Sequence, residues 1–78
     1  MSVTPDQILD CSGMACPMPI LKTKKAVESL QLGQILKMIA TDPGSTSDMQ
    51  AWTEKTGHQL VASEKEGNKF IYYVKRMK

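Results

Sequence analysis

The alternation of apolar and polar residues predicts a strand followed by a helix in the first part of the chain. Residues 7–11 (QILDC) form a short apolar-rich run that stops at the turn signal Ser12-Gly13. From residue 17 to about residue 31, apolar residues recur at helical spacing with charged residues between them, which is typical of an amphipathic helix. Gly33 lies where a C-cap glycine is expected. The inward positions of this helix would be Ile20, Thr23, Val27 and Leu30.

The middle of the chain predicts a second strand and a second helix. Residues 34–40 (QILKMIA) are mostly apolar with a single lysine, as expected for an interior strand with both faces at least partly covered. The segment Asp42-Pro43-Gly44 breaks that strand. Ser45 followed by Asp48 matches an S-x-x-D capping pattern, which predicts a helix that runs to about Thr56 and stops at Gly57. Its inward residues would be Met49, Trp52 and Thr53.

The last part of the chain predicts a β-hairpin, because the runs QLVASEK and KFIYYVK flank Glu66-Gly67-Asn68. Two helices cannot cover both faces of a four-stranded sheet well in so short a chain, so we place both on one face. We therefore predict an α/β (α+β) fold, a two-layer βαβαββ sandwich with a mixed four-stranded sheet, a right-handed parallel first crossover and an antiparallel hairpin. The other sheet face would stay partly exposed as a candidate docking surface. Because no repeat or linker interrupts the sequence, residues 1–78 are expected to form a single domain.

Composition narrows the class of protein. Two cysteines in 78 residues are too few for a disulfide-stapled secreted domain, so both are expected to be thiols in a reducing cytoplasm. The N-terminus lacks the basic and apolar regions of a signal peptide, and no apolar run approaches the ~18 residues of a membrane span. A net charge of +2 and a pI near 8.6 make the chain only mildly basic. A more basic composition, with a pI above about 9, would be needed to indicate nucleic-acid binding by itself. A soluble cytoplasmic protein is expected, with no membrane contact and no direct binding of nucleic acid.

The segment Cys16-Pro17-Met18-Pro19 carries the candidate chemistry. Proline lacks an N–H group, and this loss costs least in the first turn of a helix, so Pro17 can occupy the first helical position. Proline also pushes the preceding residue towards extended dihedral angles, which are those of an N-cap residue. Cys16 would therefore face free amides and the positive end of the helix dipole, which favour thiolate over thiol. Since Pro19 disfavours helical dihedrals at Met18, the helix could instead begin at Pro19, with Cys16 still at or just before its first turn.

The cysteines and the histidine also have plainer interpretations. Cys16 could be an ordinary buried cysteine, although Gly13 and the flanking prolines favour a displayed thiolate. Cys11, at the end of a strand, is expected to pack in the core or at an edge rather than act as a resolving thiol. His58, the single histidine, is expected to be a cation at the end of the second helix rather than a catalytic base. Because the residues also fall short of a zinc site, the sequence indicates a carrier of a group on sulfur, with no metal.

Several further residues have both a functional and a structural interpretation. The lysines of the first helix could guide an acidic partner surface to the thiol or form a solvated helix face; they are Lys22, Lys24 and Lys25. Asp42 and Asp48 could orient the loop near Cys16, but turn formation and helix capping also account for them. Trp52 is expected in the core. Gly13 would supply a backbone conformation that brings the loop close to Cys16.

These residues resemble the TusA family, also called SirA-like proteins, which are small single-domain sulfur carriers. The similarity covers nearly the whole chain and continues through Gly33, Leu36, residues 42–48 and Gly57-His58. The family signature D-x-x-G-x-x-C-P-x-P is met by Asp10, Gly13, Cys16, Pro17 and Pro19.

The resemblance implies a fold similar to the C-terminal domain of translation initiation factor three, and a persulfide carried on Cys16. In this family the cysteine thiolate takes sulfur from a donor persulfide on a cysteine desulfurase or rhodanese-like protein and passes it to an acceptor protein, without a cofactor. On this interpretation Cys16 is catalytic and Asp10 joins the possible loop-orienting residues, while the thiol is supported by Gly13, Pro17, Met18 and Pro19. The pathway, tRNA thiolation or another sulfur route, is left open by Cys11 and Met18.

Two other functions also stay open at this point. A non-catalytic RNA-binding or regulatory module that uses the basic face of the first helix would show salt-dependent affinity that survives Cys16→Ser. A thiol redox switch would form a reversible disulfide between Cys11 and Cys16 under mild oxidation. We rank the persulfide carrier, a sulfurtransferase, first and the redox switch last.

Overall fold

The computed structural model describes residues 4–14 and 18–78. Within these ranges the chain forms four strands and two helices. In chain order they are β1 (Gln7–Cys11), α1 (Met18–Glu28), β2 (Ile35–Ala40), α2 (Ser45–Thr56), β3 (Gln59–Glu66) and β4 (Lys69–Lys75). The predicted order of strands and helices is therefore confirmed.

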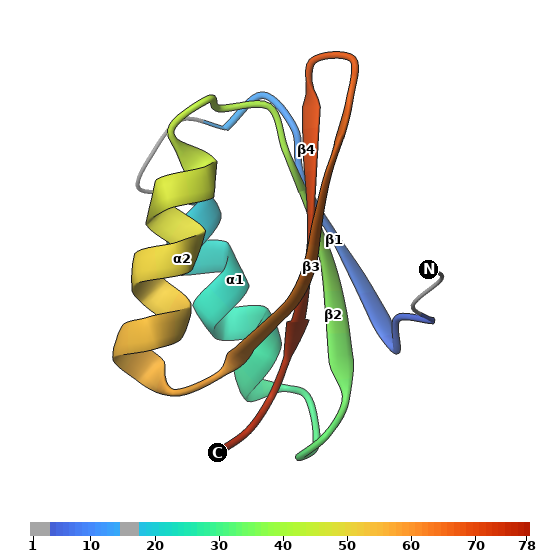
Figure 1. Cartoon of the computed structure of the whole chain (residues 1–78). Coiled ribbons are helices and arrows are strands. Elements are labelled where there is room, and N and C mark those ends of the chain that lie inside the picture. Colours follow the sequence, from blue (N-terminus) through green and yellow to red (C-terminus); the bar gives the residue numbers. More distant parts are fainter. Residues whose placement is uncertain (1–3, 15–17) are drawn as a thin grey trace.

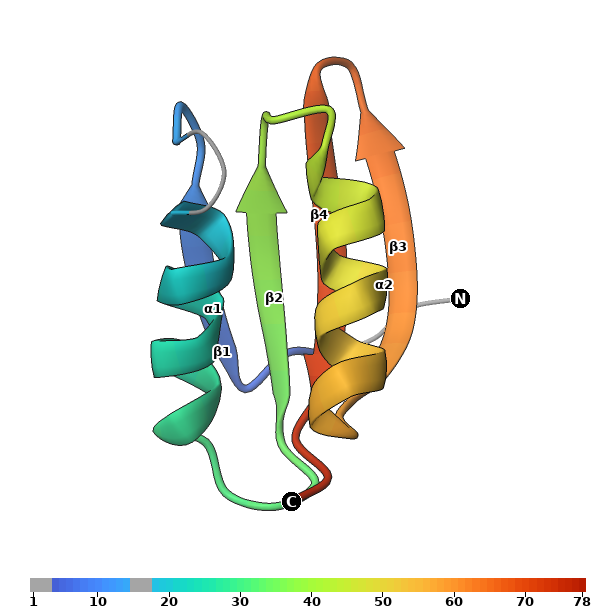
Figure 2. The ribbon, with the colours of Figure 1, turned by 90° about the vertical axis from the view of Figure 1, so that its left-hand side faces the viewer.

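The strands form one sheet, and both helices cover the same face of it (Figure 1). The strand order is β1-β2-β4-β3, with β1 and β2 parallel and β4 antiparallel to both of its neighbours. Figure 2 shows α1 in front of β1 and α2 in front of β4, beside β3. The predicted two-layer α+β sandwich with a mixed four-stranded sheet is confirmed.

The central strand β2 shows how the core forms. Side chains alternate between the two faces of a strand, so every second residue of β2 points to the helices. These residues, Leu36, Met38 and Ala40, are fully buried. On the neighbouring strand β4, Val74 and Tyr72 pair with Leu36 and Met38 and extend the same buried layer. The helices close this core with Val27 and Met49.

Helix α1 is amphipathic as predicted, but it ends at Glu28 rather than near residue 31. The N–H groups of Ser29 and Leu30 donate to carbonyls three residues earlier, at 3.1 and 3.0 Å, which tightens the final turn and stops the helix. The guanidinium of Arg76 donates through Nη1 to the carbonyls of Glu28 (3.0 Å) and Leu30. The open carbonyls of the last turn are thus satisfied by a residue that follows β4.

Gly33 does not cap α1, so this prediction is wrong. It lies between Gln31 and Gln34 in a turn that is closed by a hydrogen bond from the Gln34 N–H to the Gln31 carbonyl (3.0 Å). Its φ of +87° belongs to the left-handed region, which glycine adopts without a steric penalty. The Gly33 N–H donates to the Arg76 carbonyl at 2.8 Å. Glycine is therefore needed for the turn that leads into β2, not for the helix end.

Helix α2 has the predicted extent, but its N-terminus differs from the prediction. Gly44 occupies the N-cap position, and no side chain forms a capping hydrogen bond there. The Ser45 hydroxyl instead lies 2.7 Å from the hydroxyl of Tyr72, which is buried and needs a polar partner. The proposed Ser45 cap is therefore wrong. Gly57 ends the helix as predicted, with a φ of +83° and its N–H donating to the Thr53 carbonyl at 2.9 Å.

The sheet face away from the helices is partly exposed, as predicted. Ile8 of β1 is 61% exposed, whereas Ile71 and Tyr73 of β4 stay buried on this face between their neighbouring strands. Its use as a docking surface stays a prediction. Across the part of the chain that the structure describes, neither helix is long and apolar enough to cross a membrane.

Candidate functional site

The parallel strands β1 and β2 end side by side, and the loops that follow them lie at the same end of the sheet (Figure 2). Cys11, the last residue of β1, pairs with Ala40, the last residue of β2. The β3–β4 hairpin also turns at this end. The carboxyl ends of parallel strands are where functional loops gather in α/β sheets. The connection from β1 to α1, which holds the cysteine and proline motif in the sequence, starts here.

The first residues of this connection are held by two local hydrogen bonds. The Ser12 N–H donates to Oδ1 of Asp10 at 2.9 Å, and the Met14 N–H donates to the Cys11 carbonyl at 3.1 Å. Hydrogen bonds from the Ser12 side chain and backbone, with a smaller effect of Lys69, hold the pKa of the Asp10 carboxyl below its ordinary value. Asp10 is therefore a charged acceptor that closes the turn after β1.

Gly13 adds a third bond, which reaches another part of the chain. Its N–H donates to Oγ1 of Thr41, the first residue after β2, at 2.9 Å. Its φ is +79°, and a Cβ built on it would meet nothing within 4 Å. Glycine is therefore required here by the backbone conformation rather than by lack of space. The sequence predicted the special backbone of Gly13 but did not identify Thr41.

Cys11 lies in the core, with 0% of its surface exposed. Burial and then the Asp10 carboxylate raise the pKa of its thiol, while Lys22 lowers it to a smaller extent. A thiol with a raised pKa and no access to solvent reacts slowly, because the thiolate is the nucleophile. The structure thus agrees with the packing role expected for Cys11.

Cys16 and Pro17 lie outside the described residues, so the N-cap position and the ionised thiol expected for Cys16 stay predictions. Of the residues that follow, Met18 is the first residue of α1 and is 43% exposed, while Pro19 is buried. Pro19 in the first turn of the helix removes no intrahelical hydrogen bond, because the N–H groups there have no helical partner.

Helix α1 presents an exposed surface that starts directly after the motif. Met18, Leu21, Lys22 and Lys25 follow the spacing of one helix face. Leu21 is 54% exposed, and both lysines are exposed. Lys24 is exposed as well; it lies about 60° around the helix from Leu21, outside this group, and about 160° from Lys22. We call Met18, Leu21, Lys22 and Lys25 the α1 face.

The aspartates of the β2–α2 loop organise their own segment. Oδ1 of Asp42 accepts a hydrogen bond from the Gly44 N–H at 3.0 Å, and the Asp42 carbonyl accepts one from the Ser45 N–H at 3.0 Å. Asp48 lies in the first turn of α2, where a negative charge is favoured by the helix dipole. These contacts explain both residues as parts of the loop and the helix start. Their effect on the β1–α1 connection stays a prediction.

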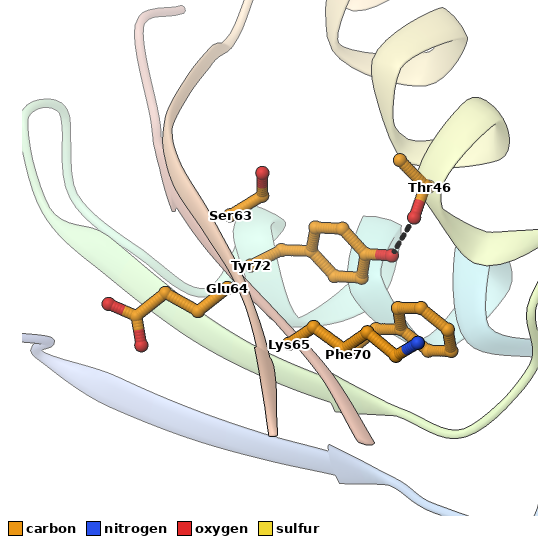
Figure 3. Close-up of a pocket in the computed structure, with 6 residues that line it drawn as sticks. All are labelled: Thr46, Ser63, Glu64, Lys65, Phe70 and Tyr72. Carbon is orange, nitrogen blue, oxygen red and sulfur yellow. Dashed lines mark hydrogen bonds between the residues drawn. The ribbon is translucent and has the colours of Figure 1, made fainter. Parts of the chain in front are cut away.

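A cavity of about 250 Å³, which the sequence did not predict, opens beside the start of α2. Figure 3 shows the Tyr72 hydroxyl directed at Thr46, at 2.8 Å, and the Lys65 ammonium over the Phe70 ring, 5.7 Å from its centre. Phe70 pairs with Ala40, so the cavity lies at the same sheet end as Cys11. It is lined by Thr46, Ser63, Glu64, Lys65, Phe70 and Tyr72. Tyr72 thus fixes the start of α2 next to the β2–α2 loop.

His58 lies at the opposite end of the sheet, after α2. Its Nδ1 accepts a hydrogen bond from the Met77 N–H at 3.1 Å, which requires this nitrogen to be unprotonated. Burial, followed by the charges of Arg76 and Lys78, lowers the pKa of His58. The expectation of a histidine cation at the end of α2 is therefore wrong. Within residues 4–14 and 18–78, no cluster of three or more His, Cys, Asp or Glu side chains could hold a metal ion.

These features define a small α+β protein in which the connection that carries the cysteine motif in the sequence begins at the carboxyl ends of the parallel strands. The family model of sulfurtransferase TusA matches residues 7–76. The sulfur carrier protein TusA of Allochromatium vinosum is 48% identical over 71 residues, which are 91% of this chain and 93% of that protein. The sulfur carrier protein TusA of Pseudomonas putida is 36% identical over 73 residues, 94% of this chain and 91% of that protein. The chain therefore belongs to the TusA family of sulfur carriers.

A solved structure supports the fold independently of close sequence similarity. The crystal structure of a SirA-like protein from Desulfitobacterium hafniense superposes with a TM-score of 0.78 and covers 92% of this chain and 99% of that one. The two sequences are 23% identical, so the comparison bears on the fold alone.

Proposed function

We propose that this chain carries sulfane sulfur as a persulfide on Cys16 and passes it from a donor protein to an acceptor protein. The observation that carries the proposal is the family match over residues 7–76, which includes the C-P-x-P motif at Cys16, Pro17 and Pro19. Residues 1–78 would act as one domain, with no cofactor. The family's sulfur carrier role supports the presence of a donor and an acceptor.

The proposed transfer is a thiol exchange that needs no oxidant or reductant. The Cys16 thiolate attacks the outer sulfur of a donor cysteine persulfide, a new S–S bond forms on Cys16, and the donor S–S bond breaks. The donor cysteine leaves as a thiolate, and Cys16 becomes Cys16-S-SH. An acceptor thiolate then attacks the outer sulfur of Cys16-S-SH, and the Cys16 thiolate leaves. Because Cys16 is regenerated in each cycle, the chain would act as a sulfurtransferase.

The choice of Cys16 over Cys11 follows from access and ionisation. The chain has two cysteines, and Cys11 is fully buried with a raised pKa. A carrier thiol must be reached by two protein partners in turn and must ionise readily. Cys11 meets neither requirement in the folded state, which leaves Cys16.

We propose the α1 face as the surface that meets the sulfur donor. It combines two exposed apolar side chains, Met18 and Leu21, with the positive charges of Lys22 and Lys25. An acidic donor surface would be attracted by these charges, and apolar contact would then hold the complex. Lys24 would add to the long-range attraction from its own side of α1. A cysteine desulfurase or a rhodanese-like protein fits the donor role, and the acceptor would serve tRNA thiolation or another sulfur route.

The cellular location follows from the same thiol chemistry. A persulfide carrier needs reduced cysteines, which persist in a reducing compartment. We therefore propose that the protein acts in the cytoplasm.

Intact-mass analysis tests the proposal directly. The purified protein is incubated with a cysteine desulfurase and cysteine, and the wild type should gain the mass of one sulfur atom, which dithiothreitol then removes. Cys11→Ala keeps the carrier thiol and should gain the same mass. Cys16→Ser should gain none. Sulfur loading that persists in Cys16→Ser and disappears in Cys11→Ala would contradict the proposal. A wild type that gains no mass but binds RNA with a salt-dependent affinity that survives Cys16→Ser would favour the RNA-binding module instead.

A further inference from the structure

Thr41 links the two loops at the carboxyl ends of the parallel strands. It directly follows Ala40, which pairs with Cys11, so it lies beside the residues that continue from β1. Its Oγ1 accepts the hydrogen bond of the Gly13 N–H at 2.9 Å, across 28 positions of the sequence. The Thr41 side chain therefore reaches from the second parallel strand to the loop of the first.

This contact differs in kind from the other two hydrogen bonds that hold residues 12–14. The Ser12 N–H bonds to Asp10 and the Met14 N–H bonds to the Cys11 carbonyl, so both stay within one short segment of chain. Local bonds fix the shape of a turn, but the turn can still tilt as a unit on the end of β1. Of the three bonds, the one to Thr41 ties the turn to a neighbouring strand and so fixes its direction.

We propose that Thr41 is a positioning residue for sulfur transfer, acting through Gly13. Holding the Gly13 backbone limits the directions in which the chain can continue towards Cys16, three residues later in the sequence. A group held near its reactive geometry reacts faster, because less motion must be frozen when the partner docks. The inference rests on the proposed role of Cys16 and adds the second loop of the sheet to the site.

The test compares Thr41→Val with Thr41→Ser. Valine has the shape of threonine without the acceptor oxygen, whereas serine keeps the oxygen. The Gly13 N–H is near solvent and can bond to water once the acceptor is gone, so both variants should fold with nearly unchanged melting temperatures. Loss of one neutral hydrogen bond corresponds to about a twofold to tenfold change in rate. We expect sulfur loading from the desulfurase to slow by this factor in Thr41→Val and to stay near the wild-type rate in Thr41→Ser.

A second measurement separates this inference from the proposed function. The rate of iodoacetamide alkylation at Cys16 is followed against pH by peptide mapping, which needs no sulfur chemistry. In Thr41→Val the alkylation rate of Cys16 at a given pH should differ from that of the wild type, whereas in Thr41→Ser it should match the wild type. If the wild type takes no sulfur, the carrier proposal fails while the alkylation profile still tests Thr41. If the wild type is loaded and Thr41→Val matches it in both measurements, or if both variants are slowed equally, the role of Thr41 is overturned.

Discussion

The imidazole of His58 is held in its neutral form by its contacts. Burial of the ring disfavours its charged form, and the positive charges of Arg76 and Lys78 oppose a further proton. Nδ1 accepts the Met77 N–H, and the Trp52 ring lies 5.5 Å away between ring centres. The pKa of His58 is therefore lower in the folded chain than its ordinary value of 6.5. Between these two pKa values the unfolded chain binds the proton and the folded chain does not.

This difference predicts that acid weakens the fold through His58. The stabilisation is fully present above the unfolded pKa, near 6.5, and is lost as the pH falls from there through the folded pKa. We expect the urea midpoint of the wild type to fall between about pH 7.5 and about pH 5.5, and His58→Ala to flatten this dependence. An NMR titration should place the imidazole pKa below 6.5. An equal loss of stability in both proteins would assign the effect to other groups.

At the scale of elements, Arg76 joins the end of β4 to the end of α1. Its Nη1 donates to the carbonyls of Glu28 and Leu30, and its Nε donates to the Lys78 carbonyl at 2.8 Å. The Arg76 backbone continues the connection, since its N–H donates to the Gln34 carbonyl at 3.0 Å. One residue thus satisfies carbonyls at and just beyond the end of α1 and secures the loop that leads into β2.

Arg76→Met should therefore destabilise the fold without changing its topology. Methionine retains much of the apolar stem but removes the donors, and we expect a loss of about 1 kcal/mol in the free energy of unfolding. For a domain of this size, such a loss lowers the melting temperature by about 4–8 °C. Calorimetry on the wild type, Arg76→Met and Arg76→Lys would measure it. Lysine offers a single ammonium group and should recover only part of the loss. A melting temperature unchanged in Arg76→Met would show that water replaces the guanidinium without loss.

The same long-range contacts explain which elements the sequence predicts well. Burial on one face repeats with the period of a strand or helix, so the extent of α2 and the buried residues Thr23 and Val27 of α1 follow from the pattern. Ile20, also predicted to point inward, is only partly buried, whereas Pro19 and Ala26 are buried.

The carbonyl at the end of α1 is satisfied by Arg76, which is 48 positions from Glu28. The N-terminus of α2 depends on Tyr72, which is 27 positions from Ser45. The spacing of residues in the sequence does not reveal such long-range pairs.

In the candidate site too, features formed by adjacent residues are predictable from the sequence, whereas contacts between distant residues are not. The sequence gives the cysteine and proline motif, because adjacent residues form it, and it gives Gly13 through the backbone freedom of glycine. It does not give Thr41, because a threonine after a strand is common and its partner becomes visible only when β1 and β2 are paired.

At the scale of the whole molecule, positive charge and apolar surface coincide on the α1 face. The chain has a net charge of +2, which is too small to attract a partner by itself, so the position of each lysine matters more than the total. Lys22 lies beside Met18 and Leu21, whereas Lys24 projects from another side of the same helix. The two lysines therefore provide a matched pair for testing a docking surface.

Lys22→Glu should slow sulfur loading more than Lys24→Glu, although the change in net charge is the same. Both variants weaken long-range attraction to an acidic donor, but Lys22→Glu also places a like charge inside the contact. We expect about a threefold to tenfold lower association rate for Lys22→Glu at low salt and a smaller drop for Lys24→Glu, measured by stopped-flow loading from the desulfurase. The difference should shrink as salt rises above about 0.1 M, where the screening length is about 10 Å. Equal effects in the two variants would mean that the charge acts only at a distance and that the donor binds elsewhere.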